Sequence, residues 1–172
     1  MNDLARPKLF LDTSLIVAPT LAEDPASPGR RLFKMGEVGL IDLWVSNHVI
    51  REAAAVLNGL LGGQYLAFQA ILAENLVLAN IATTADPSEE TIQMCIGITN
   101  YLPDARVLAA AIERDCEVLV AYDKQHLLKN PKIGPPNTRL VVMSGGEALD
   151  WAVDQVTTRA RLRQEQERQR KH

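Results

Sequence analysis

In Lys8-Leu9-Phe10-Leu11-Asp12, near the start of the chain, a short apolar run ends abruptly on an acidic residue. A run of this length and composition predicts a buried β-strand. Further short apolar runs predict further strands, which occupy residues 43–45, 76–78, 118–121 and 140–142. The first predicted strand therefore delivers a carboxylate to one end of a sheet.

Helical patterns fill the intervals between the predicted strands. Ser46 or Asn47 can cap a helix whose apolar residues recur at helical spacing until Gly62-Gly63 breaks it. The same periodicity predicts helices over residues 64–74, from Pro87 toward Asn100, from Asp104 onward, and from about residue 146. Strands that alternate with helices indicate an α/β fold with a mostly parallel sheet, covered by helices on both faces.

The composition is that of one globular domain, with 172 residues of which 47% are hydrophobic and 23% charged. The net charge of -3 means that nucleic-acid binding needs a local basic surface or bound cations. Aromatic residues are only 5% of the chain, so stacking platforms for bases are expected to be sparse. Cys95 and Cys116 match no zinc-binding pattern and are expected to be buried, reduced thiols.

The start of the chain lacks the apolar core of a signal peptide, and no apolar run is expected to span a bilayer. We therefore expect a cytoplasmic protein with no membrane association.

Four acidic residues are predicted to converge at the carboxyl ends of the strands, where ligands bind in open α/β sheets. Asp12 ends the first strand and Asp123 follows the fourth. Glu52 and Asp104 each precede apolar residues at helical spacing, so both border the buried face of their helix. Taken singly, Asp104 and Asp123 are better explained as helix N-caps, and Glu52 as a boundary residue on a solvated helix face.

Clustered carboxylates repel one another unless a cation neutralises them, and oxygen ligands suit Mg²⁺ or Mn²⁺ better than Zn²⁺. Such ions activate water and stabilise the charge of phosphodiester attack. Ser14 and Lys124 stand close to Asp12 and Asp123 and are candidates for substrate binding. For the arginine-rich tail after Thr158, contact with RNA or a partner and a solvated helix end stay equally open.

At these residues the chain resembles the PIN-domain family, to which many VapC-like toxins belong. Leu9-Phe10-Leu11-Asp12-Thr13-Ser14 is similar to the family's opening motif, an apolar strand followed by Asp-x-Ser. The segments around Glu52, Asp104 and Asp123 are similar to the next three motifs, in the same order. One departure lies in the fourth motif, where Ala121 and Tyr122 stand at positions that often carry Thr or Ser.

The resemblance implies a three-layer α/β/α sandwich of about five strands over residues 1–153, with residues 154–172 as a basic helical extension. It implies a metal-dependent endoribonuclease in which Asp12, Glu52, Asp104 and Asp123 hold Mg²⁺ or Mn²⁺ and perform catalysis. It also implies an RNA substrate, a homodimer, and a toxin that pairs with a type II antitoxin. The alternatives are a catalytically weak RNA- or protein-binding module and a structure-specific DNA nuclease.

Overall fold

A five-stranded parallel sheet forms the centre of the molecule in the computed structural model, which describes residues 5–21, 24–122 and 127–170. The strand order is β3-β2-β1-β4-β5. The strands are β1 (Lys8–Leu11), β2 (Asp42–Ser46), β3 (Ala82–Thr84), β4 (Val118–Val120) and β5 (Val141–Met143). All four strand pairings are parallel, so the predicted architecture is confirmed.

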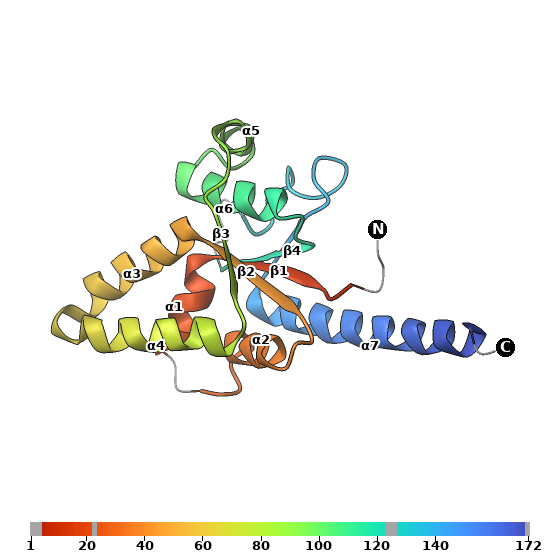
Figure 1. Cartoon of the computed structure of the whole chain (residues 1–172). Helices are drawn as coiled ribbons and strands as arrows, with labels where there is room; N and C mark the ends of the chain where they lie inside the picture. Colours follow the sequence, from red (N-terminus) through yellow and green to blue (C-terminus); the bar gives the residue numbers. More distant parts are fainter. Residues whose placement is uncertain (1–4, 22–23, 123–126, 171–172) are drawn as a thin grey trace.

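Helices cover both faces of the sheet and make the expected three layers (Figure 1). The helices are α1 (Thr13–Leu21), α2 (Pro28–Glu37), α3 (Asn47–Leu61), α4 (Tyr65–Leu78), α5 (Glu89–Thr99), α6 (Leu102–Glu113) and α7 (Gly145–Arg170), with a short 3-10 turn η1 (Gly62–Gln64) between α3 and α4. In Figure 1, α5 and α6 lie on one side of the sheet, whereas α1, α2, α4 and α7 lie on the other.

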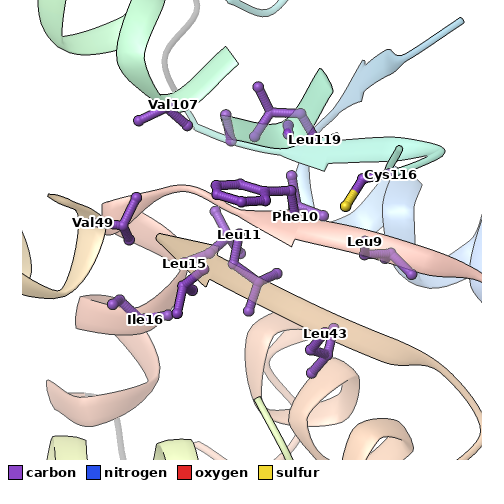
Figure 2. Packing of buried hydrophobic residues seen from close by; sticks show 14 of the residues in the cluster. Leu9, Phe10, Leu11, Leu15, Ile16, Leu43, Val49, Val107, Cys116 and Leu119 are labelled. Carbon is purple, nitrogen blue, oxygen red and sulfur yellow. The ribbon is translucent and has the colours of Figure 1, made fainter. Parts of the chain in front are cut away.

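The core is built around β1, which is the central strand. Its side chains alternate between the two faces, so that Phe10 lies on the side of Val107 from α6 and Leu11 on the side of Leu15 and Ile16 from α1 (Figure 2). All five of these side chains are almost completely buried. Burial on both faces explains why the sequence of this strand is a continuous apolar run rather than an alternating one.

One predicted strand is wrong. The sequence predicts a strand at residues 76–78, but these residues are the last turn of α4. Asn80 then adopts a positive φ of 51° and ends the helical path, and the strand follows as Ala82–Thr84. A three-residue edge strand with two threonines lacks the apolar run that identified the other strands, whereas three aliphatic residues extend a helix equally well.

Two helices, α1 and α2, are absent from the sequence-based prediction. α1 is apolar over most of its length and contains Pro19, so it shows no helical periodicity. α2 begins with readable signals, because the Ser27 hydroxyl accepts a hydrogen bond from the backbone N–H of Arg30 and Pro28 is the first helical residue. Gly36 lets α2 approach its neighbours closely, since a Cβ there would lie 2.4 Å from the carbonyl oxygen of Ala79.

One stretch of the described residues, Asn47–Leu78, is long and apolar enough by length and composition alone to cross a membrane. By length and composition, this stretch departs from the expectation that no apolar run could span a bilayer. The chain turns at Gly62, where φ is 48°, and α3 and α4 form a hairpin (Figure 1). With 15 and 14 residues, each helix is shorter than the roughly 20 residues that span a bilayer.

Candidate active site

The carboxyl edge of the sheet between β1 and β4 is the point at which the strand order reverses. From β1 the chain continues outward to β2 and β3, whereas β4 and β5 lie on the other side of β1. Crevices at such switch points are where open α/β sheets bind ligands. Asp12 lies at this point, and its backbone N–H donates to the carbonyl oxygen of Val120 at 3.0 Å, which ties it to the end of β4.

Three of the four predicted acidic residues line one cavity of about 480 Å³ at this edge. Asp12 comes from the end of β1, Glu52 from the second turn of α3, and Asp104 from the first turn of α6. Ser46 is the N-cap of α3, because its hydroxyl accepts a hydrogen bond from the N–H of Val49. The helix therefore starts at the carboxyl end of β2, and its second turn brings Glu52 to the crevice. Residues far apart in the sequence are therefore brought together, as the motif spacing predicts.

Two hydroxyl groups hold two of these carboxylates. Ser14 Oγ donates to Asp12 Oδ2 at 3.0 Å. Thr13 Oγ1 donates to Glu52 Oε2 in a short hydrogen bond between α1 and α3. Thr13 was not singled out from the sequence; its only signal is its position between Asp12 and Ser14, on a helix that packs against α3.

Asp104 is not the N-cap of its helix, so that alternative is wrong. The N-cap of α6 is Tyr101, and Asp104 lies within the first turn. The helix dipole favours a carboxylate in the first turn of α6. The Oδ2 atom of Asp104 is shielded from solvent. Tyr101 itself lines the same cavity, a position that sequence reasoning missed.

Asp123 and Lys124, the remaining predicted site residues, lie outside the described residues, as does His126. The chain is described as far as Tyr122, which follows Ala121 and lines the cavity. The departure from the family's fourth motif thus places a phenol at the edge of the cavity.

The donor chemistry of the cavity fits a hard divalent cation, because its acidic groups and hydroxyls offer only oxygen. Within residues 5–21, 24–122 and 127–170, no group of three His, Cys, Asp or Glu side chains is gathered closely enough to hold a metal ion as it stands. The assignment of Asp12, Glu52, Asp104 and Asp123 as metal ligands therefore stays a prediction.

A second, smaller pocket lies one turn along α3 from Glu52, and His48 and Arg106 line it. Burial lowers the pKa of His48; the carboxylate of Glu52 opposes this shift, and the guanidinium of Arg106 reinforces it. The imidazole is therefore neutral at pH 7. His48 is half-buried, not the surface side chain that its place at a helix start suggests.

The basic tail lies far from this cavity. α7 runs back along the sheet, and its C-terminal half projects beyond the body on the side of the amino ends of the strands (Figure 1). Arg159 has a structural role, because Nη2 contacts Glu117 at 2.5 Å and Nη1 donates to the carbonyl oxygen of Ala5 at 2.7 Å. The arginines after it are exposed.

Solved structures with the same fold include two toxin-related proteins. VapC20 of Mycobacterium tuberculosis, described as a sarcin-ricin loop cleaving toxin, gives a TM-score of 0.52 at 20% identity, covering 69% of this chain and 92% of that one. VapBC2 of Rickettsia felis, bound to a DNA fragment from its promoter, gives a TM-score of 0.58 at 14% identity, covering 80% of this chain and 98% of that one.

PAE2754 from Pyrobaculum aerophilum gives a TM-score of 0.61 at 16% identity, covering 86% of this chain and 96% of that one. No match was found among proteins of curated function. A family model described as the PIN domain matches residues 8–125. Because this match spans more than half of the chain, the protein belongs to the PIN domain family.

Proposed function

We propose that this PIN domain is a metal-dependent endoribonuclease that hydrolyses RNA phosphodiester bonds. The observation that carries the proposal is the convergence of Asp12, Glu52 and Asp104 on one cavity at the switch point of the sheet. Three separate elements deliver these carboxylates, and such an arrangement is costly in charge repulsion unless a cation is bound.

The roles of the side chains follow from their contacts. Asp12, Glu52, Asp104 and Asp123 would hold a Mg²⁺ or Mn²⁺ ion, which would supply an activated water and stabilise charge on the phosphate. Ser14 orients the Asp12 carboxylate, and Thr13 fixes the rotamer of Glu52. Hydroxyls suit this task because they orient an acid without neutralising its charge. Either Glu52 or Asp104 positions the attacking water, and Lys124 contacts the substrate.

A toxin that acts with an antitoxin is the biological setting we propose. VapC20 and VapBC2 share the fold, and the first is described as cleaving the sarcin-ricin loop. Exposed apolar side chains on α4, among them Leu66 and Val77, offer a surface for a second copy of the chain or an antitoxin. Co-expression with a small neighbouring reading frame should suppress the toxicity of a toxin, whereas a housekeeping nuclease would be unaffected.

A catalytically weak binding module is the second candidate. Ala121 and Tyr122 favour it, because they remove a hydroxyl that the family often places before the fourth acid.

The test is the cleavage of single-stranded RNA by the purified protein. Wild type should cut with Mn²⁺ or Mg²⁺ and stop when EDTA is added. Asp12→Asn keeps the volume of the side chain but removes its charge, so it should lower the rate by at least about 100-fold, the scale of losing a group that stabilises transition-state charge. Asp150→Asn, an equal charge change on an exposed turn of α7, is the matched control and should cut normally.

Undiminished cutting by Asp12→Asn contradicts the site. Intact RNA with every metal supports the binding module instead, and cutting of DNA alone supports a DNA nuclease.

A further inference from the structure

The exposed aromatic side chains of this protein are concentrated at the candidate active site. The chain has three Phe, three Tyr and two Trp, and all of them lie in the described ranges. Only Tyr101 and Tyr122 are exposed, with 48% and 42% of their surface accessible. Both line the cavity that contains Asp12, Glu52 and Asp104. In a chain so poor in aromatic residues, this placement needs an explanation.

The backbone fixes Tyr101 at the rim of the cavity. Asn100 before it adopts a left-handed conformation with φ of 56°, and α6 begins directly after it. The Thr99 hydroxyl donates to the carbonyl oxygen of Tyr101 at 3.0 Å, and the N–H of Tyr101 donates to that hydroxyl oxygen at 3.3 Å. This turn sets the tyrosine three residues before Asp104.

Tyr122 reaches the cavity from the end of β4, and a glycine makes room for it. A Cβ on Gly145, the first residue of α7, would lie 2.6 Å from the hydroxyl oxygen of Tyr122. The ring therefore packs over the start of α7, which limits its rotation. A large side chain that is half-exposed and already held in place loses little conformational entropy when a ligand stacks on it.

The rest of the cavity wall is apolar. Besides the acids and hydroxyls, its lining includes Val17, Leu21, Val56, Pro103 and Val107. Carboxylates that hold a cation do not need an apolar wall at their side. The flat apolar face of a nucleobase, in contrast, binds best against an apolar wall, because stacking and burial of that face provide most of the affinity in sequence-tolerant binding of single strands.

We infer that Tyr101 and Tyr122 form a stacking platform for an unpaired nucleobase next to the carboxylates. The inference rests on the proposed function and deepens it, because it names the form of RNA that the site accepts. A base inside a duplex is stacked on its neighbours and is not available to the platform. The platform thus selects a single strand, or a loop from which one base is turned out, and presents the adjoining phosphate to the acids.

The test measures binding without cleavage. A single-stranded RNA oligonucleotide with 2-aminopurine at successive positions is titrated with protein in EDTA, and quenching of its fluorescence reports stacking. Wild type should quench the probe at one position. Tyr101→Ala and Tyr122→Ala should each weaken binding by about 5- to 150-fold, the range expected for the loss of one stacked base.

Two further variants separate stacking from other effects. Tyr101→Phe and Tyr122→Phe keep the ring and should bind as wild type does. Val153→Ala truncates an exposed apolar residue on α7, outside the cavity, and should also bind normally. A duplex of the same sequence should bind more weakly than the single strand and should not respond to the alanine substitutions.

Wild-type affinity in both alanine variants overturns the platform, and so does a phenylalanine variant as weak as its alanine counterpart. Cleavage is measured separately with Mn²⁺. If wild type cuts RNA but the alanine variants bind and cut equally well, only the platform fails. If stacking is present but no metal supports cutting, the proposed nuclease fails and the platform stands.

Discussion

Acidic residues at the two ends of the sheet are held in different ways. At the amino end, the carboxylate of Glu117 contacts the guanidinium of Arg159 at 2.5 Å and accepts from the backbone N–H of Lys8 at 3.1 Å. At the carboxyl end, hydroxyls of Thr13 and Ser14 donate to Glu52 and Asp12. Pairing with an arginine neutralises a carboxylate, whereas a hydroxyl orients it and leaves its charge for a cation.

The amino-end contact therefore has a structural role, and the carboxyl-end contacts belong to the site that we propose to be functional. The position of an acid along the sequence does not by itself show its role. Glu117 precedes β4 and Asp12 follows β1, and both neighbour buried strands. They differ in the group that donates to the carboxylate, which is the Arg159 guanidinium for Glu117 and the Ser14 hydroxyl for Asp12.

The largest effect on stability is expected at the amino end. Arg159→Ala removes the partner of a half-buried carboxylate and a contact between α7 and the carbonyl oxygen of Ala5. The free energy of unfolding should fall by about 1.5–3 kcal/mol, the range for hydrogen bonds to charged groups. Urea denaturation measures this loss. Cleavage under native conditions should be unchanged, and a nuclease defect without a stability loss would reverse the assignment of the two ends.

A smaller effect, on rate rather than stability, is expected at the carboxyl end. Thr13→Val keeps the shape of the side chain but leaves Glu52 without its hydroxyl donor. The cleavage rate should drop by about tenfold, corresponding to about 1.4 kcal/mol in the barrier. Single-turnover kinetics at saturating Mn²⁺ measure the rate, and Thr157→Val on exposed α7 is the matched control. An unchanged rate would show that the Thr13 contact only packs α1 against α3.

The smallest effect concerns an acid that lies near the cavity but is paired with an arginine. Asp86 contacts Arg51 at 2.5 Å and accepts from the N–H of His48 at 2.7 Å. The side-chain hydrogen bond from Arg51 lowers the pKa of Asp86 below its usual 3.8. Its stabilising contribution is therefore complete above about pH 4 and is lost as the pH falls through the lowered value.

Asp86→Asn should thus be slightly less stable than wild type at pH 7, and the difference should vanish toward pH 2. Thermal melts over this pH range measure it. A difference that persists at pH 2 would mean that the carboxylate charge is not what stabilises the start of α3.

Much of the fold and part of the site are readable from the sequence, for identifiable reasons. Continuous apolar runs identified β1, β2, β4 and β5. In β1 and β4 the run reflects burial on both faces of the sheet. The edge strand β3 was misplaced, since three half-exposed residues leave no pattern. Asp12, Glu52 and Asp104 were predicted as a group from strand ends and helix faces, which are local features.

Thr13, Tyr101 and Tyr122 show what local features do not reveal. The Thr13 contact joins residues 39 positions apart, and nothing near either residue indicates it. From the sequence alone, Tyr122 is as consistent with a core residue as with one that stacks on a base. Its exposure depends on the room that Gly145 leaves for its ring. Tertiary contacts therefore decide which side chains support the acids and which face the cavity.

The change in melting temperature on adding Mn²⁺ shows most directly whether the acids at the carboxyl edge form one cation site. At a hundredfold excess over Kd a bound ion stabilises the folded state by about 2.7 kcal/mol, which corresponds to roughly 5–10 °C for a domain of this size. Asp104→Asn should melt higher than wild type without metal, because repulsion falls, and should lose most of the Mn²⁺ shift. Asp150→Asn should keep the full shift. If wild type does not respond to Mn²⁺, or if Asp104→Asn responds fully, the acids do not form one cation site.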